Sequence, residues 1–208
     1  MKERKEWKKE SNQYKISKET IDMINIKCHD FRHQIREFGD NQKIDNEAIN
    51  NLNKLIRIYD STYHTENEAL NVILNEKTLL CNNKNIRFTC IVDGNALNFI
   101  ENEDIYSLFG NLIDNSIEAV NQLDDNEKII SLKIKQVGNI VSISIKNGYK
   151  GKIQMENNLP LSKKEDNIHH GFGMKSIKMV CEKYNGNLRL NIENNIFIVT
   201  ILFIKRSD

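Results

Sequence analysis

The chain has 208 residues, enough for one ordinary domain with a helical appendage. Its 30 Lys and Arg against 29 Asp and Glu give a formal net charge of +1, so the basic excess of a dedicated nucleic-acid binder is missing. No apolar run approaches the roughly 18 to 20 residues that cross a bilayer. The four cysteines lack metal-site or disulfide-framework spacing and are interpreted as reduced thiols. We expect a soluble, cytoplasmic protein with no direct nucleic-acid partner.

Residues 1–64 are expected to form a helical hairpin. Apolar side chains recur every seven residues, a spacing typical of helices that pair along a narrow seam: Trp7, Tyr14, Ile21, Cys28 and Ile35, with Ile24, Phe31 and Phe38 at the complementary position. A single long amphipathic helix is the alternative. A second helix is expected after Gly39-Asp40-Asn41. Its apolar residues recur at spacings of three and four: Ile49, Leu52, Ile56, Tyr59 and Tyr63. Because such a hairpin has little core of its own, we expect a second copy to complete a four-helix bundle, which makes the protein a homodimer.

Residues 65–208 predict an α+β domain in which helices cover an antiparallel or mixed sheet. The capping-box form at Thr65–Glu68 predicts that a helix begins there and runs through Leu80. Further elements follow from alternating or helical patterns: strand 86–92, helix 103–123, hairpin 128–137 and 140–146 around Gly138-Asn139, helix 174–184, and strands 188–192 and 196–204 turning at 193–195. The stretch 147–170, which contains Pro160, is longer than an ordinary connection and suggests a functional lid.

The first candidate site lies on the seam helix. His29 and His33 fall beside the apolar positions, so both imidazoles should face outward. A neutral imidazole such as His29 can attack phosphorus while the Asp30 carboxylate orients it. Solvated surface is the plain alternative. Metal binding by the His29–His33 pair lacks an evident third ligand.

Three further candidates lie in the second domain. Asn111, Asn115 and Glu118 share one helix face, where amide oxygens can ligate Mg²⁺ or simply cap neighbouring loops. The segment 169–173 places Gly171 and Gly173 before a helix, where backbone N–H groups can cradle phosphates, although a glycine-rich turn without a ligand fits equally well. The strand that ends in Asn147-Gly148 predicts a plain turn when taken alone.

The order of these four features resembles the histidine kinases of two-component systems, whose catalytic domain belongs to the GHKL ATPase superfamily. His29-Asp30 most resembles the peptide-pheromone sensor group represented by AgrC, ComD and VirS. The resemblance implies a dimerisation and phosphotransfer hairpin at 1–64 and, at 65–208, a two-layer α/β sandwich of the GHKL/Bergerat ATP-binding type. It also implies binding of ATP and Mg²⁺, autophosphorylation of His29 and transfer to an aspartate of a cognate response regulator.

The resemblance also assigns the binding residues. Asn111 and Asn115 correspond to the N-box asparagines that approach the metal and the phosphates, and an Asn at 111 cannot act as a base, which suits transfer to histidine better than hydrolysis. The matching G-box and loop positions are His170, Gly171, Phe172, Gly173 and Met174, with Lys163 or Lys164 as phosphate-pairing charges. Asn147 stands where most of these kinases have the aspartate that accepts from the adenine amino group, so we expect weak ATP affinity.

Two extensions and two alternatives remain. Asp30 and Gln34 resemble a D-x-x-x-Q arrangement that positions water for phosphatase activity, with His33 as a substitute for Gln34. The resembled group contacts the membrane through an upstream sensor segment that is absent from this chain. The main alternative is an ATP-independent phosphotransfer or binding protein with a degenerate GHKL domain. An ATP-driven clamp or a serine kinase needs no His29-Asp30 on a heptad helix and is disfavoured.

Overall fold

The computed structural model describes residues 63–151, 155–156, 159–160 and 172–205. The predicted hairpin with His29, Asp30, His33 and Gln34 lies outside these residues, as do Lys163, Lys164, His170 and Gly171. The described elements, in chain order, are α3 (Glu68–Asn83), β1 (Arg87–Ile91), the short 3₁₀ turn η1 (Asn95–Leu97), α4 (Asn102–Val120), η2 (Asp125–Glu127), β2 (Ile129–Val137), β3 (Ile140–Gly148), β4 (Met155–Glu156), β5 (Leu159–Pro160), α5 (Phe172–Lys183), β6 (Asn187–Glu193) and β7 (Ile196–Ile204).

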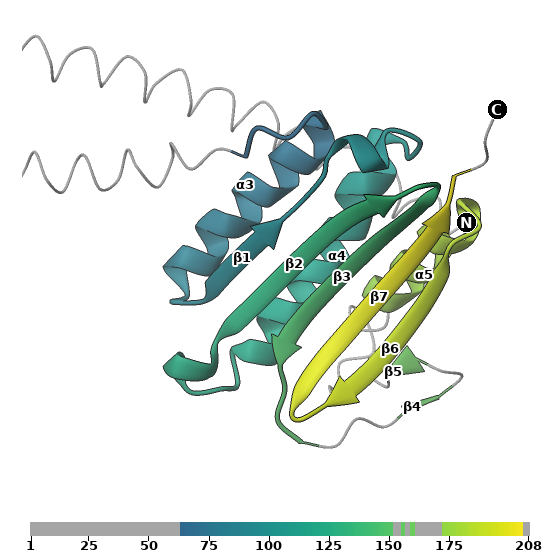
Figure 1. Ribbon diagram of the computed structural model, residues 1–208. Helices are drawn as coiled ribbons and strands as arrows, with labels where there is room; N and C mark the ends of the chain where they lie inside the picture. Colours follow the sequence, from purple (N-terminus) through teal and green to yellow (C-terminus); the bar gives the residue numbers. More distant parts are fainter. Residues whose placement is uncertain (1–62, 152–154, 157–158, 161–171, 206–208) are drawn as a thin grey trace, which may run out of the picture.

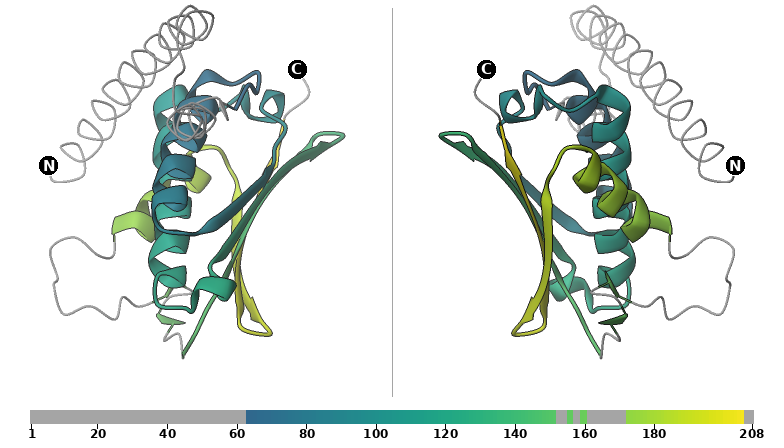
Figure 2. Two further views of the ribbon diagram at one scale, coloured as in Figure 1. Left: turned by 90° about the vertical axis from the view of Figure 1, so that its left-hand side faces the viewer. Right: turned by 90° about the vertical axis from the view of Figure 1, so that its right-hand side faces the viewer.

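Five strands form one twisted sheet in the order β1-β2-β3-β7-β6. β1 runs parallel to β2, and the other neighbours are antiparallel. The parallel pair is possible because α4 lies between β1 and β2 in the chain and provides the crossover. Helices α3, α4 and α5 cover one face of the sheet (Figures 1 and 2). The predicted two-layer α+β domain is confirmed, and its sheet is mixed.

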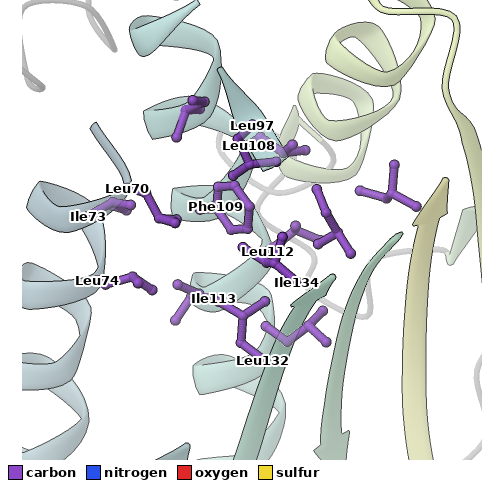
Figure 3. Packing of buried hydrophobic residues seen from close by; sticks show 14 of the residues in the cluster. Leu70, Ile73, Leu74, Leu97, Leu108, Phe109, Leu112, Ile113, Leu132 and Ile134 are labelled. Carbon is purple, nitrogen blue, oxygen red and sulfur yellow. The ribbon is translucent and has the colours of Figure 1, made fainter. Parts of the chain in front are cut away.

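The core lies between the helices and the sheet. Alternate residues of β2, β3 and β7 face it and are almost fully buried, as the strand patterns predicted: Ile130, Leu132, Ile134, Val141, Ile143, Ile145, Val199, Ile201 and Phe203. α4 supplies the middle of this core through Leu108, Phe109 and Leu112, and α3 packs beside it through Ile73 and Leu74 (Figure 3). Burial on several sides fixes the position of α4, the helix that carries both candidate asparagines.

The beginning of α3 differs from the prediction. The N-cap is Asn67, not Thr65: Asn67 has extended backbone (φ −127°, ψ 110°), and its side chain accepts a hydrogen bond from the N–H of Leu70. Thr65 instead fixes the preceding chain, since its N–H donates to Asn71 Oδ1 at 2.8 Å and its carbonyl accepts from Asn71 Nδ2 at 2.8 Å. The capping-box interpretation is therefore wrong, because Asn67 and not Thr65 occupies the N-cap position and accepts from an N–H group of the first turn.

The predicted hairpin turns are confirmed. Asn194 and Asn195 both have positive φ, 50° and 62°, the pair of angles that a type I′ turn requires. Gly138 has φ 59° at the β2–β3 turn, which a glycine adopts without steric cost. These local conformations set the register in which β2 pairs with β3 and β6 pairs with β7.

The segment after β3 was only partly anticipated. β3 continues through Gly148, and Asn147 pairs with Ile130 on one side and Phe197 on the other. The plain-turn interpretation of Asn147-Gly148 is therefore wrong, because the long neighbouring strands extend the ladder beyond Lys146. Within the stretch expected to be a lid, Met155–Glu156 pairs with Leu159–Pro160. None of the described helices combines the length and apolar character needed to cross a membrane.

Candidate functional site

A row of polar side chains follows the side of α4 that faces α5. Asp104, Ser107, Asn111 and Asn115 succeed one another at spacings of three and four, which keeps them on one face of a helix. We call these four residues the polar row. Asp104 and Ser107 are buried, and the two asparagines are half-buried. Polar groups in such a position need partners, so the contacts of each one indicate its role.

The two asparagines meet the beginning of α5. A methyl group built on Gly173 would lie 3.1 Å from Asn111 Oδ1 and 3.3 Å from Asn115 Oδ1. Glycine is therefore the residue that allows α5 to approach both amides closely. Of the other predicted G-box residues in the described part, Phe172 begins α5 and Met174 is half-buried against the core. Segments that the sequence placed in separate candidate sites thus form one site.

The side-chain amides of Asn111 and Asn115 differ in their hydrogen-bond partners. Asn111 Nδ2 donates to the carbonyl of Ser107 at 2.8 Å, which leaves its Oδ1 directed at Gly173. Asn115 Nδ2 is buried and has no hydrogen-bond partner among the described residues. An unsatisfied buried donor costs about 1–3 kcal/mol, and a ligand oxygen at this position would remove that cost. Among the described residues, neither amide caps a neighbouring loop: the bond of Asn111 goes to the backbone of α4 itself, and Asn115 Nδ2 has no partner.

The beginning of α5 adds to the same local chemistry. The first N–H groups of a helix lack intrahelical acceptors and lie at the positive end of its dipole, which favours anions. The first turn of α5 carries no acidic residue. Amide N–H donors therefore lie beside amide oxygens, a combination that suits phosphate oxygens together with a hard cation. These residues fit ATP and Mg²⁺. No group of three or more His, Cys, Asp or Glu side chains in the described residues could hold a metal by itself.

Asn147 occupies a separate position. It is 3 % exposed at the end of β3, and its Nδ2 donates to the carbonyl of Gly148 at 2.8 Å. Its alternation with Ile145 places it on the helix-facing side of the sheet. A methyl group on Gly148 would lie 2.7 Å from Leu123 Cδ1, so the chain is close-packed there. Among the described residues, no hydrogen bond joins Asn147 to Asn111 or Asn115.

A cluster at the start of the polar row was missed by the sequence reasoning. Asp104 is 0 % exposed, and its Oδ2 accepts hydrogen bonds of 2.6 Å from both Lys183 Nζ and Tyr184 Oη. Glu101 Oε2 also accepts from Lys183 Nζ at 2.7 Å, and the Glu101 N–H donates to Tyr184 Oη at 3.0 Å. The signal was present: Asp104 precedes Asn111 by two helical turns. We call Glu101, Asp104, Lys183 and Tyr184 the Asp104 cluster.

The cluster raises the pKa of Lys183 and of Tyr184. Hydrogen bonds to Asp104 and Glu101 raise the pKa of Lys183, so its ammonium form is stabilised. Burial, followed by the hydrogen bond to Asp104, raises the pKa of Tyr184, so the phenol keeps its proton. Both residues thus remain hydrogen-bond donors to the buried carboxylate at physiological pH.

The described cysteines are not candidate nucleophiles. Cys81, Cys90 and Cys181 are free thiols. Burial raises the pKa of Cys81 to about 12, of Cys90 to about 11 and of Cys181 to about 12. Since the thiolate is the reactive form, all three are unreactive at neutral pH.

Comparison with solved structures shows a fold shared with kinase catalytic domains. The catalytic domain of histidine kinase ThkA, in a nucleotide-free form, has 17% identity and a TM-score of 0.51 over 68% of this chain and 93% of that one. The Acinetobacter baumannii histidine kinase AdeS has 11% identity and a TM-score of 0.46 over 85% of this chain and 93% of that one. The ThkA likeness concerns the fold. No curated protein matches the sequence.

A sequence family gives the stronger result. The GHKL domain matches residues 100–204, which is half of the chain. The matched region begins just before α4 and ends with β7, so it contains Asn111, Asn115 and Gly173. Family match and site geometry therefore coincide, and the chain belongs to the GHKL domain family.

Proposed function

We propose that this chain is the core of a two-component sensor histidine kinase, which phosphorylates itself on His29 from ATP and passes the phosphoryl group to an aspartate of a response regulator. One observation carries the proposal. Gly173 lies against Asn111 and Asn115 while Asn115 Nδ2 lacks a partner, so the described residues form an incomplete polar site of the kind that a nucleotide phosphate would complete. GHKL membership and the fold shared with the ThkA catalytic domain support the assignment.

The residues divide the binding of ATP and Mg²⁺ between them. Asn115 Nδ2 and the first N–H groups of α5 would donate to phosphate oxygens, while Asn111 Oδ1 would face the metal. Bound Mg²⁺ would neutralise phosphate charge. An amide at position 111 has no useful basicity, so it does not activate water, which favours transfer to a histidine over hydrolysis. The neutral Asn147 at the proposed adenine end favours modest ATP affinity.

Labelling with γ-labelled ATP and Mg²⁺ tests the proposal directly. We expect the wild type to acquire a label that is lost in acid and stable in base, as a phosphohistidine is. His29→Ala should abolish this label, while His64→Ala, an exposed histidine outside the proposed site, should retain it. Asn115→Ala should lose the label together with ATP binding.

Other outcomes would identify the alternatives. An acid-stable label that survives His29→Ala would indicate a serine kinase and contradict the proposal. Absence of any label would also contradict it, and acquisition of label from a phosphorylated regulator would then support the ATP-independent relay.

The finer parts of the proposal concern residues 1–64. We assign the chain to the pheromone-sensor group on His29-Asp30, and we infer a homodimer held by the hairpin and membrane contact through an upstream sensor segment. Gln34, or His33 in its place, supports phosphatase activity. Gln34→Ala should slow dephosphorylation of the regulator, and an unchanged rate would remove this part of the proposal without affecting the kinase assignment.

A further inference from the structure

We propose that the Asp104 cluster is a positioning device that holds the far end of α5 and thereby keeps Gly173 in register over Asn111 and Asn115. This inference rests on the proposed function, since it concerns the same nucleotide site. Asp104, Lys183 and Tyr184 act on the ligand through α5 and do not touch it. They are positioning residues of the site.

The contacts between α4 and α5 form a series along the polar row. At one end, Asp104 accepts from Lys183 and Tyr184 at 2.6 Å each. In the middle, Ser107 Oγ and Ser176 Oγ lie 3.0 Å apart. At the other end, Gly173 lies against the two asparagines. The helices are thus joined by polar contacts at successive turns, and the contact with the site is the last of the series.

The Asp104 end is the most strongly held. A buried carboxylate is costly unless it is paired and hydrogen-bonded, so any movement of Lys183 or Tyr184 away from Asp104 is opposed. Asp104 Oδ1 is itself buried without a partner in the described part of the chain, which makes the two bonds to Oδ2 harder to give up. Lys183 closes α5, and Tyr184 follows it directly. The charge therefore fixes the last turn of α5.

Holding one end of α5 determines the position of the other. Gly173 and Lys183 are about 15 Å apart along the helix axis. Between them, Ile177 is fully buried in the core and acts as the point about which α5 can tilt. The tolerance at Gly173 is small, because Asn111 Oδ1 lies only 3.1 Å from the position of an added methyl group. Release of the last turn would thus shift the first turn relative to both amides.

Tyr184→Phe is the most selective test, because it keeps the ring and removes only the hydroxyl, which donates to Asp104 Oδ2 and accepts from the Glu101 N–H. Because these bonds act on the site only through α5, part of their energy should reach the ligand, and we expect ATP affinity to fall about three- to fivefold. Adenosine affinity should fall less, because adenosine lacks the phosphates beside which Gly173 is proposed to lie. Lys183→Met, which removes the charged partner of the buried Asp104, should lower ATP affinity at least as much as Tyr184→Phe, and Lys183→Arg, which keeps a charged donor, should restore much of it.

Val180→Ala provides the matched control. It lies on the same helix and is fully buried, so it lowers stability without altering the Asp104 cluster. We expect it to reduce the melting temperature at least as much as Tyr184→Phe while leaving ATP affinity unchanged well below the melting transition. Equal losses of affinity in the two variants, or no loss in Tyr184→Phe, would overturn the inference.

A second readout does not need ATP. Hydrogen exchange of the Ser176 and Ile177 amides, in the first hydrogen-bonded turn of α5, should speed up in Tyr184→Phe more than in Val180→Ala. If the wild type binds no ATP, the proposed function fails, and faster exchange in Tyr184→Phe still supports the mechanical link. Unchanged exchange would reject the link regardless of ATP binding.

Discussion

Helix α4 has two unlike flanks. Toward α3 it packs against the buried side chains of Leu70, Ile73 and Leu74. A methyl group added at Gly110 would lie 3.7 Å from Ile73 Cδ1. Toward α5 it presents the polar row and meets Gly173. We refer to these as the α3 flank and the α5 flank. One helix therefore combines an apolar packing surface with a polar surface on which some buried groups lack hydrogen-bond partners.

The polar groups of the two flanks show the same contrast. On the α3 flank, the buried Lys77 lies 2.8 Å from Asp114 and 3.3 Å from Glu76, and Tyr106 Oη donates to Glu76 Oε2 at 2.6 Å. In the part of α4 that the structure describes, the buried polar atoms without partners, Asp104 Oδ1 and Asn115 Nδ2, lie on the α5 flank. Helix α4 therefore gains stability on the α3 flank and retains binding capacity on the α5 flank. Buried polar groups without hydrogen-bond partners are uncommon in folded proteins and are expected at functional sites.

The largest expected effect is on the α3 flank. Ile73→Ala removes a fully buried side chain, and truncations of this kind cost about 2–5 kcal/mol of unfolding free energy. Chemical denaturation should show this loss, while the fraction that remains folded should bind ATP with wild-type affinity. A weakened affinity in the folded fraction would show that the α3 flank also shapes the site.

Gly173→Ala tests the α5 flank. The added methyl group would crowd Asn111 Oδ1 and Asn115 Oδ1, so one or both amides must move. We expect ATP affinity to fall at least about tenfold, which is about 1.4 kcal/mol, with a change in unfolding free energy below about 1 kcal/mol. Titration calorimetry and denaturation of the same sample separate the two effects. A variant that binds normally would contradict the proposed phosphate site.

The dependence of stability on alkaline pH tests a buried thiol on each side of α4, Cys81 on α3 and Cys181 on α5. Burial raises the pKa of each to about 12 from an ordinary 9.0, so the unfolded chain loses these protons first. Their contribution to stability is therefore complete below pH 9 and is lost as pH rises toward 12. The unfolding free energy should fall over this range. Cys81→Ala and Cys181→Ala should each make the fall shallower, and a slope that neither variant changes would argue against this origin.

The smallest expected effect is a gain. Gly110 lies within α4, and an added methyl group would meet Ile73 Cδ1 at an ordinary contact distance of 3.7 Å. Gly110→Ala should stabilise the protein by about 0.5–1 kcal/mol, because alanine loses less backbone entropy in a helix. Thermal denaturation should show a raised midpoint with ATP affinity unchanged. Gly110→Ala should thus raise stability without changing ATP affinity, whereas Gly173→Ala should lower ATP affinity with little change in stability. A loss of affinity in both variants would remove this difference between the flanks.

Local sequence patterns determined most of the fold. The alternation in residues 128–137 and 196–204 identified the strands because one face of the sheet is buried. Asn194-Asn195 identified a turn because asparagine tolerates positive φ. The resemblance carried by the order of the motifs likewise predicts that Asn111, Asn115 and Gly173 belong to one site, and the structure brings these three residues together.

Other features were decided by tertiary structure. Local signals carry no information about which distant strands pair, so the parallel β1–β2 pair and the extension of β3 through Asn147 depended on neighbouring strands. The Asp104 cluster joins segments that are far apart in the sequence. Helical spacing places Asp104 on the same face as Asn111, but no local pattern indicates that Lys183 and Tyr184 are its partners. By itself, the sequence predicted Asn111, Asn115 and Gly173 as candidates for a phosphate site, from the chemistry of their side chains and backbone. Only the packing of α5 on α4 decided how closely Gly173 approaches the amides, because that distance depends on long-range burial and hydrogen bonding.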